Sequence, residues 1–318
     1  MRAALDNANV TRYLRLEHQA VDDYPQPALK PMDDQPVAAG TYLVPFAAPA
    51  AGGRPVDLPS FVDATRIAAN QAALAPHPAP SAPGDRRAWL STLVGVEIAT
   101  TPGHVRVTFP GADPRAARLV AVLTADRELD RTWSLGKRNE EAIATYVERA
   151  LRLLAAKCPD LAADLGNLLA EIVVAGRRGT GGCSSSAAVG AVFLSPRASW
   201  PVTKYVEILV HEFVHQALFI DECVNGMFDP DADLEAPDAL VVSAVRKVPR
   251  GYDKSFHAAC VAYVQRRLYH RLGIDDPQPP GDLTETLTGL HTRRHLLTDH
   301  GRTVLAELLT LDAENPVT

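Results

Sequence analysis

The chain has 318 residues, of which 47% are hydrophobic and 22% charged, a composition typical of a globular protein with one large domain or two small ones. Its formal net charge of -6 argues against nucleic acid as the main partner, because phosphate binding requires a basic surface. We expect a cytoplasmic protein that does not enter a membrane, since no run approaches the roughly 20 apolar residues of a membrane span, the N-terminus lacks the apolar core of a secretory signal, and the cysteines form no CxxC pair.

The first 88 residues differ in composition from the rest of the chain. Residues 25–59 are rich in Pro, Ala and Gly, and residues 75–84 have the composition of an extended linker. Between them, residues 60–74 are predicted to form a short helix. We therefore predict a Pro/Ala-rich extension over 1–88 that wraps the core, and a catalytic domain over 89–318.

Regular secondary structure is predicted from residue 89 onward. Two β-rich runs joined by a Thr-Pro-Gly turn predict a hairpin over 93–98 and 104–109. Buried strands are predicted at 172–174 and 188–194, and the glycine cluster at 179–182 between them is interpreted as a flexible turn. Apolar periodicity predicts helices over 139–157, 201–224, 254–272, 283–299 and 302–311. The fold class is therefore α+β and mainly helical, with a small strand and hairpin region followed by a helical metal-binding core.

The segment 211–215, HEFVH, matches the HExxH motif. Pro201 is a favourable start for a helix and Gly226 a natural stop, and apolar residues surround the motif, so it is predicted to lie on a buried helix. His211 and His215 then lie one turn apart, where both imidazoles can converge on one metal ion. Metal coordination also explains why these polar groups are tolerated on an apolar helix, since burying them without partners costs several kcal/mol. We predict that both histidines are metal ligands.

Two histidines do not complete a metal site, so a third ligand is required. The longer metzincin motif is excluded, because Leu218 and Asp221 stand where it needs Gly and His. His257, near the start of the next predicted helix, is the best third ligand, with Glu235 or another carboxylate as the alternative. Glu222 shares the face of the motif histidines but is judged too far along the helix axis for direct ligation.

These ligands suit two chemistries, and imidazole binds iron as well as zinc. In a zinc hydrolase Glu212 would be the general base for the metal-bound water, and the strand ending at Leu194 could lie along a peptide as an edge strand. In a non-haem iron oxygenase the same ligands would hold Fe²⁺ and leave positions open for O₂ and a 2-oxo acid. The distal carboxylate of that acid needs a cation, and a guanidinium matches it. Arg250, seven residues before His257, is the candidate, with a solvated basic loop as the equally weighted alternative.

Three spaced elements resemble a known family. The runs GAVFL at 190–194 and LVHEFVH at 209–215, followed by Arg250, His257 and Ala258, are similar to the HExxH-type 2-oxoglutarate-dependent peptide β-hydroxylase family, whose members are associated with ribosomal peptide biosynthesis. The resemblance covers about Ala187 to Gly273, and it departs from the family where Gly251 replaces the Pro after the arginine. It implies Fe²⁺ held by the two motif histidines and His257, with 2-oxoglutarate and O₂ as co-substrates.

We therefore expect an Fe(II)/2-oxoglutarate-dependent dioxygenase. It would hydroxylate an unactivated C–H bond of a peptide or amino-acid-derived substrate in natural-product biosynthesis, with its metal between the helices predicted at 201–224 and 254–272. In this enzyme the catalytic residue Glu212 would form hydrogen bonds with groups next to the metal ligands and would not act as a hydrolytic base. Arg250 would bind the co-substrate. The first alternative is a zinc-dependent HExxH metallopeptidase with Glu212 as base. The second is a non-catalytic peptide-binding protein with a structural metal, which would require a fourth protein ligand.

Overall fold

The computed structural model describes residues 41–47, 58–74, 103–110, 113–124, 137–176, 181–274 and 280–314. Over these residues the protein is α+β and mainly helical, as predicted. The chain forms two compact units. The sheet unit comprises Met1–Pro55 and Ala75–Phe213, and the helical unit comprises Val56–Leu74 and Val214–Thr318. The predicted linker over 75–84 and the predicted domain boundary at residue 88 lie outside the described residues.

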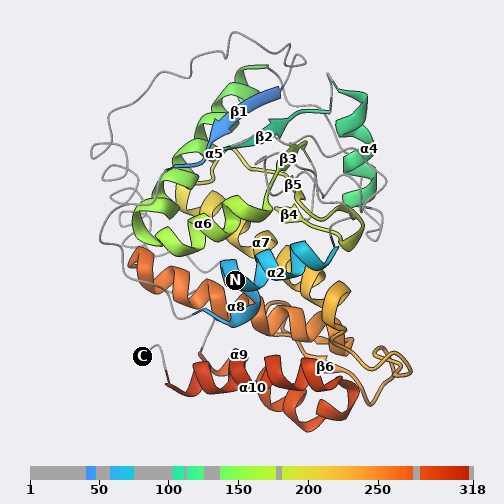
Figure 1. Cartoon of the computed structure of the whole chain (residues 1–318). Coiled ribbons are helices and arrows are strands. Elements are labelled where there is room, and N and C mark those ends of the chain that lie inside the picture. The colour runs from blue at the N-terminus through green and yellow to red at the C-terminus, as the bar shows by residue number, and fades with distance from the viewer. Residues whose placement is uncertain are drawn as a thin grey trace, which may run out of the picture. The chain divides into compact units, whose positions relative to one another are not determined.

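The sheet unit is built on one five-stranded mixed sheet (Figure 1). Its strands follow the order β1-β2-β3-β5-β4. The β2, β3 and β5 strands are parallel, whereas β1 runs antiparallel to β2 and β4 antiparallel to β5. Every residue of β3 and β5 is buried, as expected for parallel strands that are covered on both faces. The bounds are β1 (Thr41–Pro45), β2 (His104–Thr108), β3 (Glu171–Val174), β4 (Gly182–Cys183) and β5 (Ala191–Leu194).

Three helices of the sheet unit lie around this sheet (Figure 1). They are α4 (Pro114–Leu123), α5 (Lys137–Lys157) and α6 (Pro159–Leu168). The α4 helix packs against β3 and β5, and α5 packs against β1 and α6. Asp113 caps α4 by accepting a hydrogen bond from the backbone N–H of Arg115. The helix predicted over 139–157 is confirmed as α5, and its apolar stripe is buried: Ile143, Val147, Ala150, Leu151 and Leu154.

Two of the predicted strand assignments change in the structure. The run at 104–109 is confirmed as β2, but its described antiparallel partner is β1, from the N-terminal region, while residues 93–98 lie outside the described residues. The strand that ends at Leu194 lies between β3 and β4, so its interpretation as an edge strand is wrong. Part of the glycine cluster also belongs to the sheet, because Gly182 is the first residue of β4.

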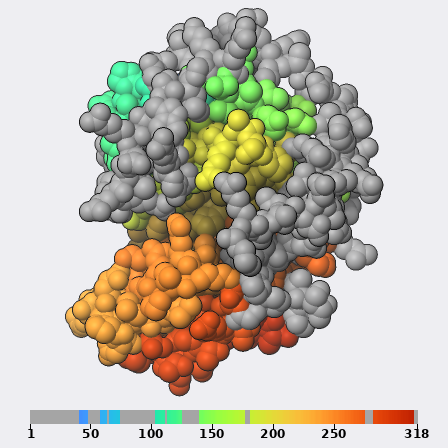
Figure 2. Space-filling model, turned by 180° about the vertical axis from the view of Figure 1, so that it is seen from behind, coloured from blue at the N-terminus to red at the C-terminus, as the bar shows by residue number. Residues whose placement is uncertain are grey.

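The helical unit packs its helices around α8 (Tyr252–Leu272). Most of α8 is buried, from Tyr252 to Leu272, and Gly273 ends it in the left-handed conformation with φ of 66°. A short hairpin of β6 (Val241–Val242) and β7 (Pro249–Arg250) precedes it. Figure 2 shows the described residues of this unit from Val214 onward, coloured orange to red, as one continuous body of packed atoms. The remaining elements are η1 (Ser60–Val62), α2 (Ala64–Leu74), α9 (Pro280–Thr292), η3 (Arg294–Leu296) and α10 (Asp299–Glu314). The α7 helix (Val202–Asn225) belongs to this unit from Val214 onward.

The predicted helices agree with this unit except near residue 293. The short helix predicted over 60–74 is confirmed as η1 and α2. The helix predicted over 283–299 is interrupted, because Leu297 has extended backbone angles and forms a bridge with Phe228. Thr298 precedes α10, and its hydroxyl accepts a hydrogen bond from the backbone N–H of Gly301 at 3.1 Å. None of the described helices is long and apolar enough to cross a membrane.

Candidate functional site

The HExxH motif lies on α7, a continuous helix of 24 residues. His211 and His215 are one turn apart on it and both are half-buried. Three of their neighbours, Val210, Phe213 and Val214, are no more than 1% exposed. The motif therefore occupies the buried helix that its apolar surroundings predict.

The structure brings His215 together with His257, which α8 contributes. Their Nδ1 atoms are 3.2 Å apart, and the rings are tilted by 22° with centroids 5.4 Å apart. The centroid separation exceeds the nitrogen–nitrogen distance by about two ring radii, so the two Nδ1 atoms point toward each other. Two of the three predicted metal ligands thus meet, although 42 residues separate them in the sequence.

The spacing of these two nitrogens fits a shared metal ion. Nitrogens that each lie about 2.0–2.1 Å from one tetrahedral zinc ion are about 3.3 Å apart, close to the 3.2 Å between His215 and His257. Burial lowers the pKa of His257 to about 4, so its imidazole is neutral at physiological pH, the form that binds metals. Across the described part of the chain, no group of three or more His, Cys, Asp or Glu residues has the geometry to hold a metal ion. The pair therefore fits as two ligands of a metal without forming a complete set.

The second nitrogen of His257 faces a carboxylate. Its Nε2 atom lies 4.0 Å from Oε2 of Glu222, and the ring of Phe219 packs 5.3 Å from the His257 ring. Burial, and secondarily the charge of Asp253, raises the pKa of Glu222. Glu222 lies two helical turns beyond His215 on the same face of α7, and His257 extends from α8 onto that face. Sequence reasoning set Glu222 aside because it considered distances along one helix only.

Glu212, the second residue of the motif, lies within the sheet unit. It is 4% exposed, and its Oε2 accepts a hydrogen bond from the hydroxyl of Ser184 at 2.7 Å. The adjacent strand β4 packs closely on α7: a Cβ at Gly182 would lie 2.7 Å from Cγ2 of Ile208 and 3.0 Å from Oε1 of Glu212. The glycine cluster, interpreted from sequence as a flexible turn, thus allows a strand to approach the motif helix.

Two other predicted site residues lie elsewhere in the helical unit. Glu235 is exposed and forms an ion pair with Lys254, which competes with any metal ion for its carboxylate. Arg250 lies on β7, where it pairs with Val241, and its carbonyl accepts a hydrogen bond from the hydroxyl of Ser255 at 3.5 Å. The role of Arg250 as an anchor for a 2-oxo acid stays a prediction.

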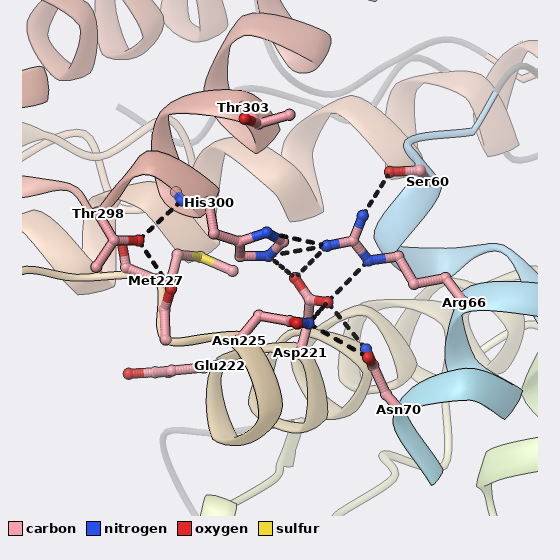
Figure 3. Close-up of polar contacts among 12 residues, drawn as sticks. Ser60, Arg66, Asn70, Asp221, Glu222, Asn225, Met227, Thr298, His300 and Thr303 are labelled. Carbon is pink, nitrogen blue, oxygen red and sulfur yellow. Dashed lines mark hydrogen bonds and ion pairs between the residues drawn. The ribbon is translucent and has the colours of Figure 1, made fainter. Parts of the chain in front are cut away.

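A buried charge cluster that sequence reasoning missed is centred on Asp221, also on α7 (Figure 3). Asp221 is 0% exposed. Arg66 donates to its carboxylate from Nε at 2.8 Å and from Nη2 at 3.2 Å, and His300 Nε2 lies 2.7 Å from it. Asn70 and Asn225 donate to Oδ1 at 2.9 and 3.0 Å. Burial alone would raise the pKa of Asp221, but its hydrogen bonds, first of all with Arg66, hold that pKa below its usual value.

The Asp221 cluster joins α2, α7 and α10 within the helical unit. It continues through Ser60, whose hydroxyl lies 3.3 Å from Nη1 of Arg66 and donates to Glu307 at 2.7 Å. A sequence signal for it exists, because Asp221 follows Val210, Val214 and Ala217 at the spacing of the buried stripe of α7. A carboxylate on such a stripe requires a partner in the core.

The α7 helix therefore carries the motif histidines, Glu212, Asp221 and Glu222 on a single element. Figure 3 shows Asp221 reaching toward Arg66 and His300, whereas Glu222 points away from that cluster. Comparison of the chain with protein-family models and with curated protein sequences gives no match.

Proposed function

We propose that this protein is a metalloenzyme whose metal ion is held by His211, His215 and His257. The observation that carries the proposal is the 3.2 Å approach of the Nδ1 atoms of His215 and His257, together with the position of His211 one turn away on the same helix. The near-complete burial of His257 supports it, because a neutral buried imidazole keeps a lone pair available to a metal.

We further propose that the metal is Fe²⁺ and that the enzyme is a 2-oxoglutarate-dependent oxygenase. Bound iron would supply the oxidation of a substrate C–H bond to C–OH by O₂, coupled to conversion of 2-oxoglutarate to succinate and CO₂. The resemblance of residues 187–273 to the peptide β-hydroxylase family supports this choice. It also supports a peptide or amino-acid-derived substrate in natural-product biosynthesis.

The protein's own side chains would then bind and orient the reactants. The guanidinium of Arg250 would hold the distal carboxylate of 2-oxoglutarate in a bidentate ion pair. Glu212 would orient the groups that hydrogen-bond to it next to the metal. The carboxylate of Glu212 is held by the hydrogen bond that it accepts from the hydroxyl of Ser184. Replacing Arg250 with Lys keeps the charge but loses the planar pair of donors. We therefore expect R250K to raise the KM for 2-oxoglutarate more than it changes kcat.

An anaerobic titration tests the proposal. The metal-free protein is titrated with Fe²⁺ and 2-oxoglutarate while the visible charge-transfer absorption of their complex is followed. We expect a band that needs both components and is lost in H257A. The H291A variant is the matched control, because His291 is an exposed histidine of the same unit, and it should keep the band. A wild-type protein that binds Fe²⁺ but never develops the band would contradict the oxygenase.

A zinc-dependent metallopeptidase is the second candidate, and the position of Glu212 favours it. Its buried carboxylate is packed against β4, the last strand in the sheet order, and a carboxylate beside the metal ligands is what a general base requires. The E212Q variant distinguishes the two enzymes. Peptide hydrolysis by the zinc-loaded protein should nearly vanish in E212Q, whereas oxygenation should persist with weakened metal binding. E207Q, on the same helix but outside the motif, should leave either activity unchanged.

A further inference from the structure

His257 has two ring nitrogens with different surroundings. Nδ1 faces Nδ1 of His215 at 3.2 Å, and Nε2 faces the carboxylate of Glu222 at 4.0 Å. The His257 side chain is 10% exposed and that of Glu222 is 40% exposed. The flexible glutamate therefore has room to turn and shorten the 4.0 Å gap, whereas the imidazole is fixed by its packing against Phe219.

A neutral imidazole carries one proton, on Nδ1 or on Nε2, and only the unprotonated nitrogen can bind a metal. In the Nδ1–H form, His257 would direct a proton at His215 and could not ligate there. A carboxylate at Nε2 favours the opposite tautomer, because it accepts a hydrogen bond from Nε2–H. The nitrogen of His257 that faces His215 then keeps its lone pair.

We propose that Glu222 is a positioning residue that holds His257 in the Nε2–H tautomer and thereby presents Nδ1 of His257 to the metal. This role rests on the proposed function in that it assigns Glu222 to the metal site of His215 and His257. The tautomer of His257 is nevertheless a property of the metal-free protein. It can be measured whether or not a metal later binds.

The first measurement is the tautomer of His257 in the full-length, metal-free chain at neutral pH. Long-range ¹H–¹⁵N correlations distinguish protonated from unprotonated ring nitrogens, and the H257Q variant assigns the signals. We expect Nε2–H in the wild type and a shift of population toward Nδ1–H in E222A. E222Q keeps one acceptor oxygen without the charge, so its shift should be smaller. E285Q, which changes an exposed glutamate of the same unit, should resemble the wild type.

The second measurement is metal affinity, with Co²⁺ as the probe and its visible d–d bands as the readout. Loss of a carboxylate behind a metal-bound histidine costs about 10–100-fold in affinity, and we expect that loss for E222A with the shape of the bands preserved. Circular dichroism and thermal unfolding of the metal-free variants should match the wild type, which separates positioning from a folding defect.

Three results would overturn the role of Glu222. The first is a wild-type His257 that is protonated on Nδ1, and the second is an E222A variant with unchanged tautomer and unchanged Co²⁺ affinity. The third is an altered band shape in E222A, which would make Glu222 a ligand instead. Failure of the wild type to bind Co²⁺, Fe²⁺ or Zn²⁺ would contradict the proposed metalloenzyme, and the tautomer result would still decide whether Glu222 positions His257.

Discussion

Replacing Asp221 with alanine should destabilise the helical unit more than any exposed substitution on α7. The carboxylate is 0% exposed and accepts hydrogen bonds from Arg66, Asn70 and Asn225, with His300 at 2.7 Å. Each hydrogen bond to a charged group contributes about 1.5–3 kcal/mol, but bonds that share one acceptor are not additive. Breaking a buried ion pair by removing one partner costs about 3–5 kcal/mol. We expect D221A to fall at the low end, near 3 kcal/mol, because the side chain of Arg66 is 26% exposed and regains water.

Urea unfolding followed by circular dichroism measures this free energy, and amide hydrogen exchange localises it. We expect faster exchange in α2 and α10, the two helices that the cluster joins to α7. D231A is the matched control, since Asp231 is an exposed aspartate of the same unit, and it should change the free energy of unfolding by no more than about 0.5 kcal/mol.

A double-mutant cycle with R66A tests the assignment of Arg66 as the main partner of Asp221. The combined loss in R66A/D221A should be smaller than the sum of the single losses, by about 0.5–3 kcal/mol. The reasoning is refuted if D221A costs less than about 1 kcal/mol, or if exchange in α2 and α10 is unchanged.

Three further predictions concern the close approach of β4 and the pH dependence of stability. Gly182→Ala should destabilise the protein by about 1–3 kcal/mol, because the new Cβ would lie 2.7 Å from Ile208. Gly166→Ala on α6 should stabilise it by about 0.5–1 kcal/mol, because that Cβ would meet only the side chain of Phe46, at an ordinary contact distance of 3.5 Å. A G182A variant as stable as G166A in urea would count against the packing of β4. Folding lowers the pKa of Asp221 below 3.8, so the ionised carboxylate stabilises the protein above that pH, and this stabilisation is lost as the pH falls through the folded-state pKa. The free energies of unfolding of the wild type and D221N should therefore converge at low pH. Curves that stay parallel would contradict this. In the metal-free protein, folding lowers the pKa of His257 from 6.5 to about 4. As the pH falls from 6.5 to 4, the unfolded chain therefore binds a proton that the folded protein does not, and the free energy of unfolding should decrease. H257Q should show a shallower decrease, and an identical slope would exclude His257 as the source of the pH dependence.

The helices α5 and α7 could be predicted from the local spacing of apolar residues in the sequence. The apolar stripe of α5 from Ile143 to Leu154 repeats at the period of a helix, so its extent and its buried face follow from the sequence alone. The same holds for α7, because the apolar residues around the HExxH motif predict a buried helix. On a helix, the four-residue spacing of His211 and His215 puts them one turn apart. In each case a residue's environment depends on neighbours within two turns of the chain.

The pairing of strands is different, because it depends on which distant segments share a sheet. The antiparallel neighbour of β2 is β1, about 60 residues earlier in a region whose Pro/Ala-rich composition indicates an extension. The β5 strand is internal only because Gly182 and Cys183 pair along its other side, and Gly182 can do so only because it has no Cβ to collide with α7.

The features of the candidate site also separate into those that follow from local sequence and those that depend on tertiary contacts. By itself the sequence determined the motif helix, its two histidines one turn apart and the need for a further ligand, since these follow from helix geometry and from the cost of burying unpaired imidazoles. Only the tertiary structure decided that His257 meets His215, that Glu222 lies at the other nitrogen of His257, and that Asp221 is the centre of a buried charge cluster. These contacts join helices that are far apart in the sequence, and the side chains that meet there depend on how whole helices pack.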